Sequence, residues 1–312
     1  MMLGIALAIG GAALALALGV RAGREPVAVD DELRRSAPGV LLALPDGATH
    51  VVCHGPRDGV PLVLVPGATL SLWIWKGLPE RLAAAGYRVV AYDLYGRGYS
   101  DRPATRYDAA LFDRQLLGVI DACFPDGRVH LVGLAFGCLI AAGFATRHPE
   151  RTGRLAFLGA DGFGVRLSRS DRLLTTPWLG PLLVRLVGNR RLLARLEDYT
   201  PDAKVIAWLR EHYAPELAWR GFKRALLSSI RHMPIHRAGA LYRDLEANGR
   251  APLLVWGSED RVTPVPNARV LQEILPRADV RILDGIGHLP HVEALDETEA
   301  LLREHLEKDR ER

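Results

Sequence analysis

The chain has 312 residues, of which 49% are hydrophobic and 24% are charged, which is globular composition and excludes disordered and collagen-like classes. The formal net charge of +4 is mild for this length and does not indicate a nucleic-acid partner. The cysteines are too few for a disulfide scaffold and too scattered for a thiolate zinc site, so we expect buried free thiols at Cys53, Cys123 and Cys138.

The first predicted element is an apolar segment at the N-terminus. Leu3–Val20 carries no charge, and as a helix it would be about 27 Å long, close to the hydrocarbon core of a membrane at about 30 Å. Arg21 and Arg24 follow it, so the positive-inside rule predicts a membrane-associated protein whose main domain is cytoplasmic. Two alternatives remain, namely the signal peptide of a secreted or periplasmic protein and a glycine-containing helix that packs on protein.

Short apolar strands alternate with helices after this segment. Val40–Leu44 and His50–Cys53 flank the turn sequence Pro45-Asp46-Gly47 and predict a hairpin. Alternation of strands and helices requires crossover connections, so it predicts an α/β fold with a mostly parallel sheet. Further strands are predicted at Leu62–Val65, Arg88–Tyr92, Val129–Val132, Leu155–Leu158, Leu253–Trp256 and Val280–Leu283, and helices at Leu78–Ala85, Tyr107–Ala122 and Ile140–Arg147.

The pattern changes in the second half of the chain. Helical sequence rich in Arg and Leu dominates there and contains no strand candidate. We interpret this region as a helical insertion between two strands of the sheet. The predicted organisation is an apolar N-terminal helix over residues 1–24, a core formed by residues 25–161 and 250–312, and a helical cap over residues 162–249.

The most informative turn follows the predicted strand Val129–Val132. Its sequence is Gly133-Leu134-Ala135-Phe136-Gly137, and a helix leaves it. A strand, a G-x-S-x-G turn and a helix form the nucleophile elbow, in which the central residue is strained and both glycines avoid collisions with neighbouring elements. Here Ala135 takes the central place, and a methyl group cannot attack a carbonyl. The chain therefore has no nucleophile at the position where this arrangement presents one.

With these residues the chain resembles the α/β-hydrolase family from about residue 40 to its C-terminus. Asp93–Ser100 resembles the family's D-x-x-G-x-G-x-S turn, and Val65–Ala68 stands in the place of its oxyanion loop, with proline where histidine is usual. Val255–Pro264 resembles the segment that carries the acid, and Gly285–His288 resembles the histidine loop. The resemblance implies a mostly parallel central sheet with helices on both faces and a helical cap.

The resemblance also implies a role for each candidate residue. His288 would move the proton, because imidazole titrates near neutral pH, and Asp260 would fix its tautomer. The backbone N–H groups of Ala68 and Phe136 would form the oxyanion hole. Asp161 is a rival for the acid, because some hydrolases that resemble this chain carry their acid after that strand. No metal ion or organic cofactor is implied.

Ala135 leaves two explanations open. Either a serine was deliberately replaced by alanine, or the natural protein has lost its nucleophile. Asp260 and His288 would serve little purpose in a protein that had long been without the serine, so we favour deliberate replacement.

The overall plan resembles membrane-anchored monoacylglycerol-lipase-like serine hydrolases. It implies a carboxylic ester hydrolase acting on an apolar small-molecule ester, for example one of acylglycerol type. A C–C bond hydrolase or lactonase with the same triad is one alternative, and a non-catalytic ligand-binding protein is another. The oligomeric state is not predicted. The aromatic residues expected to contact substrate are Trp73, Trp75, Phe163 and Trp178.

Overall fold

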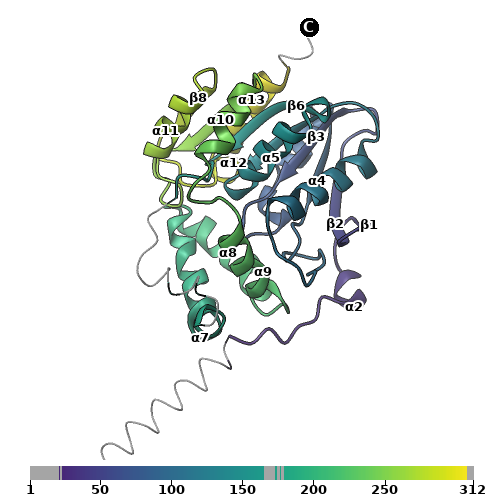
Figure 1. The fold of residues 1–312 in the computed structure, drawn as a ribbon, viewed down its shortest axis with the longest axis vertical. Coiled ribbons are helices and arrows are strands. Elements are labelled where there is room, and N and C mark those ends of the chain that lie inside the picture. Colours follow the sequence, from purple (N-terminus) through teal and green to yellow (C-terminus); the bar gives the residue numbers. More distant parts are fainter. Residues whose placement is uncertain (1–20, 22, 165–172, 174–175, 177–178, 308–312) are drawn as a thin grey trace, which may run out of the picture.

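A computed structural model describes residues 21, 23–164, 173, 176 and 179–307. Its centre is an eight-stranded sheet in the order β1-β2-β4-β3-β5-β6-β7-β8 (Figure 1). The β1–β2 and β2–β4 pairs are antiparallel and all the others are parallel, which confirms the predicted α/β fold. The strands are β1 Val40–Leu44, β2 Gly47–His54, β3 Val60–Val65, β4 Tyr87–Tyr92, β5 Val129–Leu134, β6 Thr152–Leu158, β7 Leu253–Gly257 and β8 Asp279–Leu283.

Helices cover both faces of this sheet. In β3, Val63 and Val65 belong to the core shared with α4, α5, α10 and α11, whereas Leu62 and Leu64 belong to the core shared with α3 and α13. Burial on both faces explains why the strand reads as a continuous apolar run. The helices around the sheet are α2 Asp31–Arg34, α3 Leu78–Ala84, α4 Ala109–Cys123, α5 Phe136–Arg147, α10 Gly239–Ala247, α11 Pro266–Ile274, α12 Pro290–Glu293 and α13 Leu295–Glu307, with 3₁₀ turns η1 Leu72–Trp75 and η2 Pro149–Arg151.

Two helices begin at residues other than those predicted. Helix α4 begins at Ala109 because the Asp108 carboxylate caps it, accepting a hydrogen bond of 3.1 Å from the N–H of Leu111. Helix α5 begins at Phe136, directly after the turn, and its first residues are therefore helical although they belong to the glycine motif.

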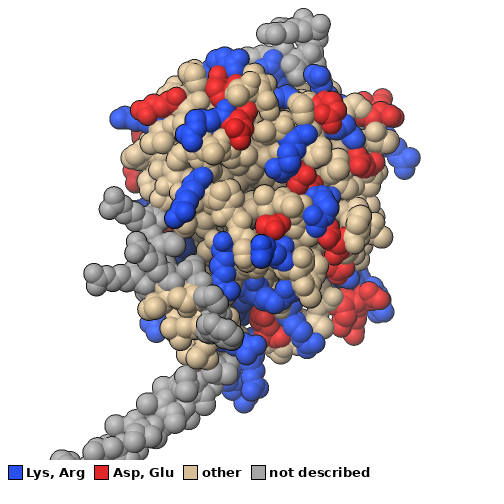
Figure 2. Space-filling view, in the orientation of Figure 1, with Lys and Arg blue, Asp and Glu red and all other residues tan. Residues whose placement is uncertain are grey.

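The cap helices lie between β6 and β7. Figure 1 shows them beyond the end of the sheet, apart from the helices that cover its faces. They are α7 Leu179–Ala194, the 3₁₀ turn η3 Arg195–Asp198, α8 Ala203–Glu216 and α9 Phe222–His232. Figure 2 shows Lys and Arg interspersed with Asp and Glu over the face of the molecule that it presents.

Residues 23–27, which we call the N-terminal strap, lie against the cap. Val27 forms a β-bridge with Trp219, with hydrogen bonds of 3.1 and 2.7 Å to the backbone on either side of it. The Glu25 carboxylate accepts hydrogen bonds from the N–H groups of Gly221 (3.0 Å) and Lys223 (2.7 Å). A carboxylate there is favourable, because the N-terminus of α9 carries unpaired N–H groups and the positive end of the helix dipole.

Two expectations are corrected. No helix in the described part of the chain is long and apolar enough to cross a membrane, and this finding overturns the expected membrane-associated localisation. The apolar segment itself, residues 3–20, lies outside the described residues. The thiols are free, but of the three only Cys138 is buried, while Cys53 is exposed and Cys123 is partly buried.

Candidate functional site

Ala135 lies at a sharp turn between β5 and α5. It has φ +49° and ψ −110°, and no other described residue except glycine has a positive φ. A Cβ atom on Gly137 would lie 2.1 Å from the carbonyl oxygen of Val65, and one on Gly133 would lie 2.7 Å from the backbone nitrogen of Cys138. The two glycines therefore let the turn pack against β3 and against its own helix, which holds Ala135 in its strained conformation.

Asp260 and His288 follow β7 and β8 and meet at the carboxyl end of the sheet. His288 Nδ1 lies 2.8 Å from Asp260 Oδ2, and both side chains are buried. Asp260 Oδ1 accepts hydrogen bonds from the N–H groups of Val262 (2.9 Å) and Thr263 (2.8 Å), so the carboxylate is fixed on both oxygens. With Nδ1 engaged by the carboxylate, Nε2 is the ring nitrogen left for proton exchange.

Thr263 is a further contact of this pair. Its hydroxyl donates a hydrogen bond of 2.8 Å to Asp260 Oδ2 and lies 3.3 Å from His288 Nδ1. Gly159, at φ +52°, makes room for the pair, because a Cβ atom there would lie 3.0 Å from His288 Nδ1. Sequence analysis assigned neither residue a role, although Thr263 lies within the segment that resembles the family's acid segment.

The two expected oxyanion donors lie beside Ala135. Phe136 is the first residue of α5, so its N–H has no acceptor within the helix, and the helix dipole adds to its positive potential. Ala68 lies in the loop after β3, and a Cβ atom on its neighbour Gly67 would come within 4.0 Å of the Ala135 Cβ. Both donor residues line the same cavity as Ala135 and His288.

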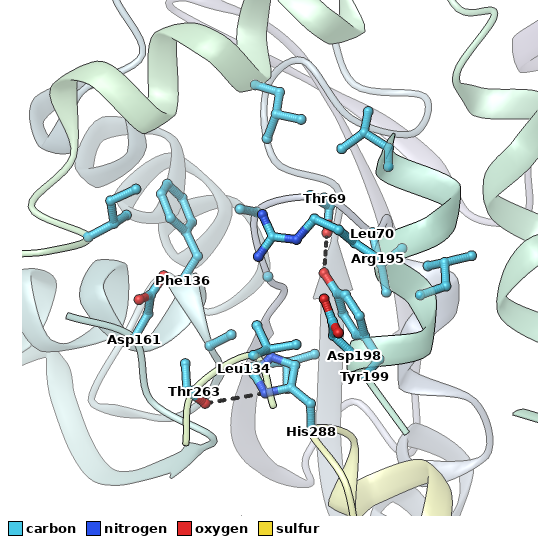
Figure 3. Close-up of a pocket in the computed structure, with 18 of the residues that line it drawn as sticks. Thr69, Leu70, Leu134, Phe136, Asp161, Arg195, Asp198, Tyr199, Thr263 and His288 are labelled. Atoms are coloured by element: carbon cyan, nitrogen blue, oxygen red, sulfur yellow. Dashed lines mark hydrogen bonds between the residues drawn. The ribbon is translucent and has the colours of Figure 1, made fainter. Parts of the chain in front are cut away.

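This cavity has a volume of about 610 Å³ and lies between the sheet and the cap. Its apolar lining comes from both parts of the molecule. Figure 3 shows the Arg195 side chain extending from η3 into the cavity. The charged residues in the lining are Arg191, Arg195, Arg261, Asp161 and Asp198, and the apolar ones include Leu70, Leu134, Leu192, Leu196, Leu226, Ile230, Ile235 and Val262.

Asp161, the rival acid, lies in the same cavity (Figure 3). Its Oδ1 accepts a hydrogen bond of 2.8 Å from the N–H of Gly162, whereas the carboxylate hydrogen-bonded to His288 belongs to Asp260. Burial penalises the charged form and raises the pKa of Asp161 to about 6. Asp161 is therefore a carboxyl group facing the ligand space rather than the partner of the histidine.

Of the aromatic residues expected at the substrate, the three that the structure describes are not among the residues that line the cavity, namely Trp73, Trp75 and Phe163. Trp75 is buried and packs on His291 with ring centroids 4.8 Å apart, because η1 turns it beneath the loop. Trp73 donates its indole N–H to Glu216 over 2.8 Å, and Phe163 stacks on Tyr242 at 5.7 Å. Trp178 lies outside the described residues.

Tyr199 takes the place that these aromatic residues were expected to fill. Its ring packs edge-on against His288 with centroids 5.3 Å apart. Its hydroxyl lies 2.7 Å from that of Thr69, in the loop that carries the Ala68 donor. Sequence analysis did not identify it, since it lies in the cap, far along the chain from both partners.

A family model described as the alpha/beta hydrolase fold matches residues 60–295. A 2-hydroxymuconate semialdehyde hydrolase from Pseudomonas putida is 29% identical over 77% of this chain and 84% of that protein. A meta-cleavage product hydrolase from Pseudomonas fluorescens, solved as a serine-to-alanine variant with acetates, has a TM-score of 0.70, 22% identity and coverage of 87% and 98%.

A protein from Burkholderia cenocepacia described as a putative aryl esterase has a TM-score of 0.69, 21% identity and coverage of 88% of this chain and 99% of that one. The similar proteins thus include meta-cleavage product hydrolases and esterases. They do not support the more specific resemblance to monoacylglycerol-lipase-like enzymes.

Proposed function

Because this chain belongs to the α/β-hydrolase family and is a hydrolase by that membership, we propose that its site hydrolyses carboxylic esters through a serine at position 135. The Ala135 form would bind such an ester without cleaving it. The observation that carries the proposal is the shared cavity, which Ala135, His288 and the two N–H donors at Ala68 and Phe136 all line.

Each group has a step in this reaction. A serine hydroxyl at position 135 attacks the ester carbonyl while His288 Nε2 takes its proton, and Asp260 stabilises the imidazolium. The N–H groups of Ala68 and Phe136 stabilise the tetrahedral oxyanion. His288 then gives the proton to the oxygen of the leaving alcohol. The C–O bond breaks, the alcohol departs, and an acyl-enzyme remains. Water attacks the acyl-enzyme while His288 again takes a proton, and His288 returns this proton to the serine oxygen as the acid is released.

The proposed substrate is an ester with an apolar acyl group. Leucine and isoleucine side chains from the core and the cap surround the space next to Ala135, and such a lining favours an apolar chain. An acylglycerol-type ester is one member of this class. A lactone, which is a cyclic ester, would react through the same steps.

A second candidate is hydrolysis of a C–C bond in a substrate that carries a carboxylate. Arg195 extends into the cavity, and Arg191 and Arg261 also line it, so an anionic group would find cationic partners there. Similar proteins include hydrolases named for 2-hydroxymuconate semialdehyde and 2-hydroxy-6-oxo-2,4-heptadienoate, and such names denote carboxylates.

The test of the first proposal is Ala135→Ser. We expect hydrolysis of short and long p-nitrophenyl esters at a rate at least about 10³-fold above that of the Ala135 protein, because the substitution supplies the nucleophile. The control adds His288→Gln to Ala135→Ser and returns the rate to that of the Ala135 protein. No turnover of any ester, lactone or amide would instead favour a non-catalytic binding protein that has lost its serine naturally.

Arg195→Met separates the two substrate classes. In the Ala135→Ser background, KM for a carboxylate-bearing substrate should rise about tenfold, because a charge-assisted contact is lost, while KM for a neutral ester stays within about twofold. Steady-state kinetics on a neutral ester and on its ω-carboxy analogue measure the difference. Equal changes for both substrates would exclude Arg195 as an anion partner.

A further inference from the structure

Arg97 is a fully buried arginine in the turn after β4. Its guanidinium makes no ion pair with a carboxylate of the described residues. Instead it donates hydrogen bonds to neutral acceptors: Nε to the carbonyl of Ala68 (2.7 Å) and its two terminal nitrogens to the carbonyl of Tyr95 (3.0 Å) and to Oγ of Ser229 (2.9 Å). Burial lowers the pKa of Arg97 to about 10. Taking a cation out of water is unfavourable, so the burial of this arginine requires a structural reason.

One of these acceptors belongs to the candidate oxyanion hole. Ala68 supplies an expected donor N–H, and its carbonyl is the group that Arg97 holds. The held carbonyl fixes the Ala68–Thr69 peptide plane and with it the position of the Ala68 Cα, so the donor N–H on the other side of that Cα is anchored at one end. An oxyanion donor is effective only when it is held in advance in the geometry of the transition state.

Another acceptor belongs to the cap. Ser229 lies on α9 and uses its own hydroxyl hydrogen in a bond of 3.0 Å to the carbonyl of Ala225. Leu226 and Ile230, on the same helix, line the cavity. A Cβ atom on Gly96, the neighbour of Arg97, would lie 2.2 Å from the Ala225 Cβ, so the turn and α9 are in close contact. One side chain thus joins the oxyanion loop to a helix that shapes the ligand space.

We propose that Arg97 is a positioning residue that fixes the Ala68 oxyanion donor and couples it to the seating of cap helix α9. This rests on the proposed ester hydrolysis for its catalytic consequence, but the coupling itself is a property of the Ala135 protein. A displacement of α9 would weaken the hydrogen bonds of Arg97, and this change would in turn loosen the loop that carries Ala68. The bound substrate, by contacting Leu226 and Ile230, would act on the same connection.

The test of the coupling is Ser229→Ala in the Ala135 protein. This substitution leaves one guanidinium nitrogen without its acceptor and does not touch the loop directly. Amide hydrogen exchange measured by mass spectrometry should become about tenfold faster in residues 66–72, as expected for a segment that opens more easily. Ser228→Ala, the neighbouring hydroxyl on α9, is the matched control and should leave that exchange rate unchanged. Unchanged exchange in residues 66–72 of the Ser229→Ala protein overturns the proposal.

The catalytic consequence is tested in the Ala135→Ser background. Ser229→Ala and Arg97→Lys should each lower kcat about tenfold and change KM less than about threefold, because the affected donor acts in the transition state. A change confined to KM contradicts the link to the oxyanion donor. If the Ala135→Ser protein has no activity, the proposed function fails and the exchange experiment alone decides whether the coupling exists.

Discussion

Ala135 keeps a backbone conformation that is unfavourable for any residue with a Cβ atom. Its φ of +49° is combined with a ψ of −110°, and the packing of Gly133 and Gly137 against their neighbours leaves the turn no room to relax. Strain of this kind costs about 1–3 kcal/mol. The strain arises from the Cβ atom, which alanine and serine share, so alanine carries it just as a serine would.

Ala135→Gly should therefore stabilise the protein. The relief of strain exceeds the loss of about 0.5–1 kcal/mol that glycine's flexibility in the unfolded chain causes, so we expect a gain of about 1 kcal/mol in the free energy of unfolding. Urea denaturation measures it. Ala207→Gly, at an exposed position within α8, is the control and should cost about 1 kcal/mol. A loss of similar size in both variants would mean that the turn is not strained.

Among the elements, helix α8 is joined to the core by a buried carboxylate. Glu216 accepts hydrogen bonds from the Ser71 hydroxyl (2.5 Å) and the Trp73 indole (2.8 Å), both in the segment that follows the oxyanion loop. Burial, together with the charge of Asp93, raises the pKa of Glu216 from 4.5 to about 7. The contact between the cap and the core is thus sensitive to pH near neutrality.

The sign of the pH dependence follows from this raised pKa. The folded state holds the proton more tightly, so the stability that the protonated carboxyl contributes is complete below pH 4.5 and is lost as the pH rises to about 7. Glu216→Gln has no charge to bury at any pH. Its free energy of unfolding, relative to the parent protein, should therefore increase by about 1–3 kcal/mol between pH 5 and pH 8.

Denaturation of both proteins at the two pH values measures this difference. Glu211→Gln, on the exposed side of the same helix, is the matched control and should show no such increase. A difference between Glu216→Gln and the parent that stays constant with pH would show that the carboxylate is not buried in its charged form.

For the whole molecule, the fold was predictable because the apolar runs and turn signals are local. The hairpin, the parallel strands and the helical region before β7 all follow from neighbouring residues. Ala135, Asp260 and His288 could be placed together for a related reason. Each follows a strand, and the carboxyl ends of parallel strands meet at one edge of the sheet. Their catalytic roles remain predictions.

The remaining parts of the site depend on contacts between distant residues. Tyr199 meets Thr69 across 130 positions, and Arg97 meets Ser229 across 132. No local pattern announces such pairs. Trp75 was expected at the substrate for the opposite reason, because it lies close to the oxyanion loop along the chain, but η1 turns it into the core. Proximity in sequence to a functional loop does not determine which side of that loop a ring occupies.

The N-terminal strap limits how the cap can move. Glu25 and Val27 attach the strap to the start of α9 and to Trp219 just before it. The chain continues from the strap through α2 to β1, which lies at the edge of the sheet away from β6 and β7, where the cap is connected (Figure 1). A cap attached only through its connections to β6 and β7 could rotate away from the sheet about those two connections. Because the N-terminal strap attaches the cap on the other side as well, only a smaller tilt is open to it. Ligands would then enter through an opening made by side-chain movement. Loss of the contacts of the N-terminal strap would let the whole cap move and would widen this entrance.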